Sequence, residues 1–205
     1  SVDFGDLTDA RSYAAAASNA TRGAHGGGAD PTVSNIIDYY QIATTGNATD
    51  FGDLTVARKA GAGSSNNTRG IAGGGFAPAV KDVLDYITIA SGGTATDFGN
   101  MTSGRYFLAS SSTGHGGLEL ESEPRGLPVG RGIGLFGGGM TPSITTVINE
   151  LAISTLGTSS DFGDMTSSLY SHMNSAASTT RCLACCGADA NIKKMSYLQS
   201  HLKFL

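Results

Sequence analysis

Asp50-Phe51-Gly52-Asp53-Leu54-Thr55 is one of four copies of a motif that divides the chain into repeats. The Asp-Phe-Gly core of the motif begins at Asp3, Asp50, Asp97 and Asp161, so successive copies are 47, 47 and 64 residues apart. The phenylalanines of the four copies are Phe4, Phe51, Phe98 and Phe162. If the ends of the 205-residue chain are joined, Asp161 and Asp3 are again 47 residues apart. The spacing therefore predicts four units of about 47 residues in a ring, with one insertion of 17 residues.

Each repeat presents the same features in the same order. A threonine and an arginine follow the motif, Thr8 and Arg11 in the first copy, but the fourth copy has Leu169 in place of the arginine. A stretch of small residues, a second arginine and a glycine run come next. The apolar pattern after the glycines predicts strands at 36–43, 83–90, 147–154 and 195–202. Because the turns between these strands are rich in Gly and Asn, each repeat is predicted to form about four short strands. Four such strands make one blade of a β-propeller.

The chain begins in the middle of a repeat. Residues 1–11 are the end of a unit whose earlier strands lie in residues 183–205. We expect Asp3-Phe4-Gly5 to pair with the strand at 195–202, so that both termini share a blade and close the ring. Pairing of the ends between two chains, which gives a larger ring, is the alternative. The predicted fold is a single all-β domain over residues 1–205, a four-bladed β-propeller.

One position on the apolar face of each predicted strand is polar. It is occupied in turn by Asp38, Asp85, Asn149 and Ser196. Burying a polar group without a partner costs roughly 1–3 kcal/mol, so each of these side chains needs one. We predict that the second arginine of each repeat bonds these side chains or backbone carbonyls near them. These arginines are Arg22, Arg69, Arg131 and Arg181.

The composition excludes several classes of protein. Thirty glycines and a charged fraction of 15% are typical of a turn-rich β-protein. A net charge of −4 without a basic cluster argues against binding to nucleic acid or to anionic membranes. The chain has no apolar run of the roughly 18 residues that a membrane-spanning helix needs. It also shows no export leader, unless one has been removed.

Several of these features resemble a known class of propeller. Glycine runs at strand ends, a tyrosine in the next strand, a Thr-Gly-Asn turn and an arginine opening the next unit resemble kelch repeats. The unit at residues 48–55 resembles the repeat of virion structural proteins from aquatic bacteriophages and related viruses. The resemblance covers nearly the whole chain outside the insertion. The kelch tryptophan is missing and kelch domains usually have more blades, so a propeller is better supported than the kelch label.

The Asp-Phe-Gly motif itself is predicted to be structural. Protein kinases contain the same tripeptide, but no phosphate loop, catalytic lysine or His-Arg-Asp accompanies it here. The motif is closer to the aspartate box of sialidase-like propellers, in which the Asp and Thr satisfy the backbone of a turn. Calcium held by paired carboxylates such as Asp50 and Asp53 is the alternative.

The cysteines are predicted to be plain thiols. Two of Cys182, Cys185 and Cys186 stand where other copies have glycine. A disulfide, or a zinc site completed by His172 and His201, is the alternative. No metal and no cofactor is predicted.

The insertion at about 114–130 is the best sequence candidate for a specific contact, because loops inserted in repeat proteins often bind partners. Its candidate binding residues are His115, Glu119, Glu121, Glu123 and Arg125. A disordered excursion is the alternative.

The sequence thus predicts a non-enzymatic structural or adhesion module. The resemblance implies a virion surface or another extracellular setting, with other virion proteins or a host surface glycan as partners. A monomeric ring and a homo-oligomer both remain open. The alternatives are a lectin-like glycan-binding propeller and a sugar-processing enzyme of the galactose-oxidase or sialidase type.

Overall fold

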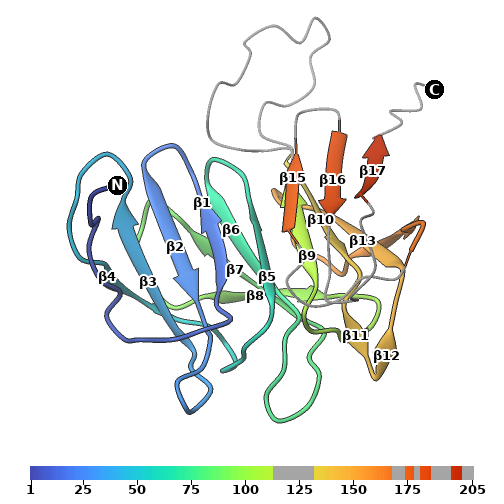
Figure 1. Cartoon of the computed structure of the whole chain (residues 1–205), viewed down its shortest axis with the longest axis horizontal. Helices are drawn as coiled ribbons and strands as arrows, with labels where there is room; N and C mark the ends of the chain where they lie inside the picture. The colour runs from blue at the N-terminus through green and yellow to red at the C-terminus, as the bar shows by residue number, and fades with distance from the viewer. Residues whose placement is uncertain (113–131, 168–173, 178–180, 186–194, 200–205) are drawn as a thin grey trace, which may run out of the picture.

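The computed structural model describes residues 1–112, 132–167, 174–177, 181–185 and 195–199, which form strands, turns and loops without a helix (Figure 1). Three antiparallel sheets have four strands each, and a fourth sheet has three strands. The predicted all-β class is therefore confirmed. In Figure 1 the first sheet lies on the left, the second in the middle and the third on the right, with the fourth above the third.

Neighbouring strands in each sheet follow one another in the sequence, except that the short strands β11 and β12 lie between β10 and β13. The first sheet contains β1 (Ala15–Ser18), β2 (Arg22–Gly26), β3 (Ile36–Gln41) and β4 (Thr49–Asp53). The second contains β5 (Ala62–Ser65), β6 (Arg69–Gly73), β7 (Val83–Thr88) and β8 (Thr96–Asn100). The third contains β9 (Ala109–Ser112), β10 (Ile133–Gly137), β13 (Val147–Ala152) and β14 (Ser160–Asp164). The fourth contains β15 (Asn174–Ala177), β16 (Arg181–Cys185) and β17 (Met195–Gln199), and β11 (Met140–Thr141) pairs with β12 (Ser143–Ile144).

The second and third copies of the Asp-Phe-Gly motif connect their sheet to the next one. In the second copy, Asp50 Oδ1 accepts a hydrogen bond from the amide of Gly52 at 3.0 Å. Gly52 has a φ of 139°, which suits glycine, and a Cβ there would lie 2.6 Å from the backbone of Gly93. The glycine thus allows close approach, and Phe51 O accepts a hydrogen bond from Gly93 N of the second sheet at 2.7 Å. The other three copies have the same aspartate bond and a similar φ.

Small residues and serines bring the inner strands of adjacent sheets together. Strand β1 packs against β5, β5 against β9, and β9 against β15. Ser65 Oγ donates to Ser18 O at 2.7 Å, Ser110 Oγ donates to Gly63 O, and Ser175 Oγ donates to Ser110 O. A Cβ on Gly63 would lie only 2.1 Å from a backbone oxygen of β1, so larger residues are excluded from this contact. The small-residue stretches of the sequence are therefore the joints between sheets.

Apolar side chains fill the space between the sheets on either side of these joints. The buried set between the first and second sheets comprises Ala24, Ile37, Phe51, Leu54, Ile87, Ile89 and Ala95. The set between the second and third sheets comprises Ala62, Ile71, Leu84, Phe98, Met101, Leu108, Phe136, Leu151 and Ile153. The core therefore consists of separate layers, each shared by two neighbouring sheets, as in other repeat proteins.

The termini do not share a sheet in the described part of the chain. There, β17 pairs only with β16, and Asp3-Phe4-Gly5 belongs to no strand. The N-terminal segment packs on the first sheet instead, where Phe4 O accepts a hydrogen bond from Gly46 N at 2.8 Å. The chain start and β17 lie on opposite sides of the molecule in Figure 1. The structure thus differs from the predicted closure: within the described residues the N-terminal segment contacts the following sheet, as the second and third motifs do, but pairs with no strand of the fourth sheet.

Candidate functional site

The recurrent polar residues Asp38, Asp85 and Asn149 are fully buried at one equivalent position in the first three sheets. Each lies next to an irregularity in the pairing of the third and fourth strands of its sheet. Such a bulge interrupts the ladder and re-aims a side chain. The three residues therefore occupy equivalent buried positions, at each of which the polar side chain needs a partner.

In the first two sheets the buried aspartate binds a threonine and an arginine. The amide and hydroxyl of Thr8 donate to the two carboxylate oxygens of Asp38 at 3.2 and 2.5 Å, and Arg11 Nη2 lies 2.6 Å from Oδ2. In the second sheet the amide and hydroxyl of Thr55 donate to Asp85 at 3.1 and 2.6 Å. Arg58 lies 2.9 Å from the same carboxylate. Each cluster therefore contains an ion pair removed from water.

In the third sheet an amide replaces the carboxylate. Arg105 Nη2 donates to Asn149 Oδ1, and Nη1 donates to the carbonyl of Val147 at 2.5 Å. Asn149 Nδ2 donates to Thr102 Oγ1 at 2.8 Å, so the threonine accepts where its counterparts donate. Burial lowers the pKa of Arg105 to about 10, and Asp161 only partly opposes this effect. Burial also lowers the pKa of Arg58, which Asp85 opposes.

The prediction that the second arginine binds the buried polar side chain was wrong for Arg22 and Arg69, which bind backbone carbonyls. Arg22 Nη1 donates to the carbonyls of Ile89 and Ala90 in the second sheet at 3.1 and 2.9 Å. Its guanidinium also stacks on Tyr39, 4.8 Å from the ring centre. Arg69 bonds the third sheet in the same way, through the carbonyls of Ile153 and Ser154, and stacks on Tyr86. The second arginine of the repeat is therefore a clip between sheets, and the first arginine is the buried partner.

The prediction that Arg131 is equivalent to Arg22 and Arg69 was also wrong. Arg22 pairs with Gln41 in its sheet and Arg69 pairs with Thr88, but the corresponding position opposite Ala152 is Ile133. Arg131 itself lies outside the described residues. Arg181 does occupy the equivalent place, opposite Gln199.

One signal in the sequence identifies the correct arginine. The fourth repeat has Leu169 in place of the first arginine and Ser196 in place of the buried acid or amide. The second arginine is kept in that repeat, as Arg181. Loss of the first arginine together with the acid indicates that these two residues are partners.

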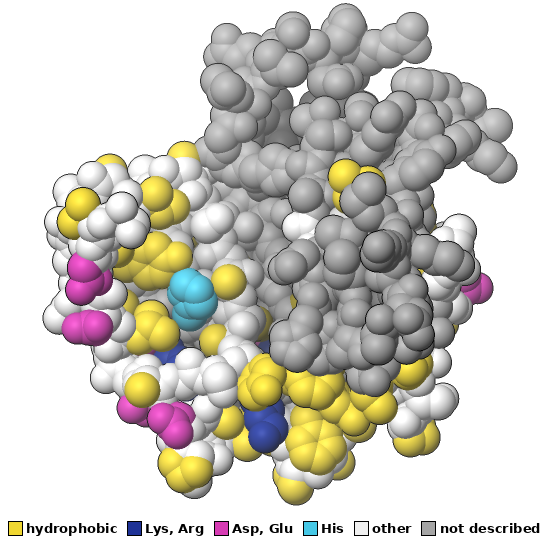
Figure 2. Space-filling model, viewed as in Figure 1, with side chains coloured by type: hydrophobic (Ala, Val, Ile, Leu, Met, Phe, Trp, Pro, Cys, Tyr) yellow, Lys and Arg dark blue, Asp and Glu magenta, His cyan; other side chains and the backbone are white. Residues whose placement is uncertain are grey.

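A cavity of about 360 Å³ lies along the inner strands. Its lining residues are Ala16, Ala17, Ser18, Tyr40, Gly63, Ser64, Ser65, Ser110, Ser111, Ser112 and Ser175. No charged side chain is among them, and charged side chains are few on the face seen in Figure 2. A hydroxyl-rich, uncharged lining suits a neutral polar ligand better than an ion.

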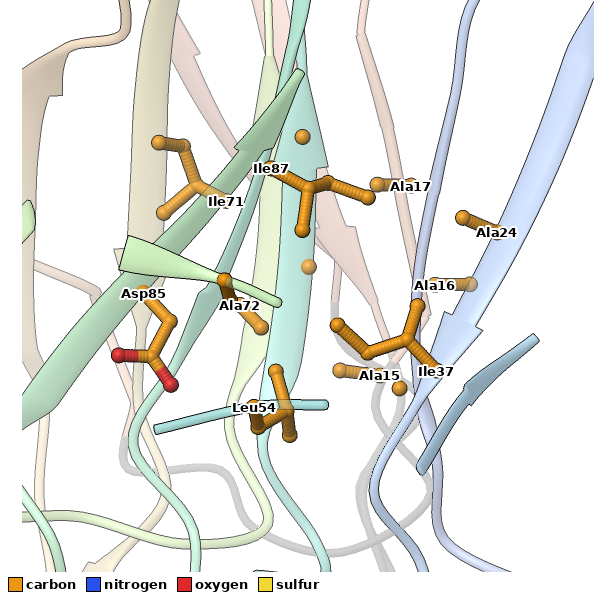
Figure 3. Close-up of a pocket in the computed structure, with 14 residues that line it drawn as sticks. Ala15, Ala16, Ala17, Ala24, Ile37, Leu54, Ile71, Ala72, Asp85 and Ile87 are labelled. Atoms are coloured by element: carbon orange, nitrogen blue, oxygen red, sulfur yellow. The ribbon is translucent and has the colours of Figure 1, made fainter. Parts of the chain in front are cut away.

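A second cavity lies between the first and second sheets and holds only about 20 Å³ (Figure 3). Alanines and isoleucines line it, and its one charged neighbour, Asp85, is already bonded to Thr55 and Arg58. Space for about one water molecule with an apolar lining is a packing gap rather than a ligand site.

Several predicted site residues cannot be placed. His115, Glu119, Glu121, Glu123 and Arg125 lie outside the described residues, as do His172, His201 and Cys186. The side chains of Arg181, Cys182, Cys185 and Ser196 are also outside the described part. In the part that is described, no three His, Cys, Asp or Glu side chains come together as a possible metal site. The same part contains no long apolar helix that could cross a membrane.

No protein-family model matches the chain, and no curated protein is detectably similar to it.

Proposed function

We propose that the chain is a non-enzymatic structural or adhesion module of the propeller type, in which the four sheets act as blades. The supporting observation is that its repeated polar groups bind one another. The buried Asp and Arg side chains pair in the first two sheets, and Arg22 and Arg69 bind carbonyls of the next sheet. Groups used in this way hold a scaffold together and are not free to act on a substrate.

The proposed setting is a virion surface or another extracellular surface, with virion proteins or a host surface glycan as partners. The resemblance of the repeat supports this setting. The few charges also fit a contact surface that does not attract nucleic acid.

Glycan binding is the second candidate, and the serine-lined cavity favours it. Hydroxyl groups can donate to and accept from the hydroxyls of a neutral sugar. Ser111 lines the cavity and is buried, so its replacement changes the lining with little effect on the outer surface. A sugar-processing enzyme would in addition need a nucleophile beside a base, or a metal, at the cavity.

A glycan array combined with an assay for released sugar separates these functions. For a scaffold we expect no released sugar and no saturable binding that depends on the cavity. Saturable binding that Ser111→Val abolishes, with an unchanged melting temperature, would favour the glycan-binding function. Sugar release that the same variant abolishes would overturn the non-enzymatic proposal.

A further inference from the structure

The faces between internal sheets contain a repeated set of buried apolar residues. Ile89 and Ile153 are 0% exposed, Phe51 is 5% exposed and Leu54 is 4% exposed. Each belongs to a contact that recurs along the chain. Ile89 N, for example, donates to Thr68 O as Ile153 N donates to the carbonyl at position 132. Low exposure of these residues is therefore the mark of a face that a neighbouring sheet covers.

The first sheet has equivalent apolar residues on its outer face, but no neighbouring sheet covers them in the described part of the chain. Ile42 N donates to Thr21 O, which identifies Ile42 as the counterpart of Ile89 and Ile153. Ile42 is 44% exposed, and the motif residues Phe4 and Leu7 are 39% and 36% exposed. Figure 2 shows hydrophobic side chains at the surface on the left, over the first sheet. Three large apolar side chains thus lack the neighbour that covers their counterparts.

The opposite end of the array has the complementary face. Leu183 pairs with Ala176 in the fourth sheet, as Ala24 pairs with Ala17 in the first and Ile71 pairs with Ser64 in the second. Ala24 and Ile71 are buried in the layers toward the following sheet. Leu183 is 40% exposed.

Two further features of the fourth sheet fit the uncovered face of the first. Arg181 occupies the place of Arg22 and Arg69 in its sheet. Arg22 and Arg69 each donate to the carbonyls of the two residues that directly follow the third strand of the next sheet. In addition, β17 pairs only with β16 within the described residues, whereas each third strand of the other sheets pairs with a motif strand. The N-terminal segment contains that motif and is not in a strand.

We propose that these two end faces bind each other between copies of this chain, head to tail. The fourth sheet of one copy would cover Phe4, Leu7 and Ile42 of the partner subunit, whose motif segment would pair with β17. A second copy is the proposed occupant because both faces are open in the same chain and lie on opposite sides of it (Figure 1). Such a contact is heterologous, so it produces a ring if the rotation closes and a filament if it does not.

The test uses one variant for each face. Phe4→Asp/Ile42→Asp disables the first-sheet face, and Leu183→Asp disables the fourth-sheet face. Light scattering after gel filtration, across a dilution series, should show wild-type particles whose mass rises with concentration. Each variant alone should stay monomeric, and an equimolar mixture should form a dimer and nothing larger, because one intact pair of faces remains. Leu156→Asp, at a 59% exposed turn residue, is the control and should behave as wild type.

Two outcomes would overturn the proposal. A wild-type monomer at all concentrations with slow amide exchange at residues 3–7 would mean that the chain closes on itself. A wild-type monomer with fast exchange there would mean that the faces stay open. Circular dichroism checks that each variant folds, and Ile42→Thr replaces the double variant in the mixing test if the latter does not.

Discussion

The buried clusters of the second and third sheets contain an arginine at the equivalent position, but its partners differ. Arg58 is paired with the carboxylate of Asp85 at 2.9 Å, whereas Arg105 binds the amide of Asn149 and the carbonyl of Val147. Both guanidinium groups are buried. Neutral acceptors therefore suffice to place a cation here, but they do not remove the cost of burying its charge, which is seen in the lowered pKa of Arg105.

The comparison makes Arg58→Leu the most damaging change. It would leave the Asp85 carboxylate buried with Thr55 as its remaining partner, and breaking a buried pair in this way typically costs about 3–5 kcal/mol. Urea unfolding measures the loss. The control is Arg58→Leu/Asp85→Ser, which reproduces the residues of the fourth repeat and should recover more than half of the loss. Equal losses in the single and double variants would show that the carboxylate does not depend on the arginine.

Asp85→Asn converts the second cluster into the chemistry of the third. The threonine must then accept from the amide, as Thr102 does from Asn149, and one charge-assisted bond is lost. We expect a loss of about 1–3 kcal/mol in the free energy of unfolding. Asp30→Asn, in an exposed loop, is the matched control and should change little. A neutral Asp85→Asn would mean that counter-charge contributes nothing at this site.

The reverse change, Asn149→Asp, should stabilise the third cluster by about 1 kcal/mol at neutral pH, because the bond to Arg105 becomes charge-assisted. The pKa of Arg105 in the fold, about 10, lies below its ordinary value, so above pH 10 the unfolded chain binds more protons than the folded one. The stability contribution of Arg105 in the wild type therefore improves as pH rises past 10. The advantage of the variant should be complete at neutral pH and shrink above pH 10 in paired urea titrations. A constant advantage would contradict this origin.

The smallest effect concerns the first cluster, where His25 lies opposite Asp38. Burial lowers the pKa of His25, Arg11 lowers it further, and Asp38 opposes both. As pH falls below the ordinary value of 6.5, the unfolded chain is protonated first, so wild-type stability should decrease by less than about 1 kcal/mol. His25→Ala, which introduces the residue found at the equivalent position 72, should remove this pH dependence. The melting temperature of both proteins between neutral and mildly acidic pH provides the measurement.

Much of the fold could be predicted from the period of the sequence. The strands β3, β7, β13 and β17 lie within the predicted ranges 36–43, 83–90, 147–154 and 195–202. Alternation of apolar residues and recurrent glycines are local properties of a strand and its turns, so they can be recognised from the sequence alone. The closure of the ring could not, because chain length does not determine the angle between successive sheets.

The partners of the buried groups were harder to predict for a related reason. Arg11 and Arg22 both belong to features that recur along the chain, so periodicity alone does not show which of them is the partner of Asp38. The choice depends on the path of the backbone after the motif, which brings Arg11 back to the middle of β3. The sequence did indicate that Arg131 is not equivalent to Arg22, since the glycine run begins six residues after Arg131 but four residues after Arg22.

The serine joints between the inner strands have a consequence for how such a chain can change in evolution. In each joint the hydroxyl of Ser65, Ser110 or Ser175 donates to a main-chain carbonyl of the preceding sheet. Every residue offers that carbonyl, so a duplicated or deleted unit meets a suitable acceptor at its new border whatever side chains it encounters there. Unequal recombination can therefore lengthen or shorten the array while each junction remains satisfied.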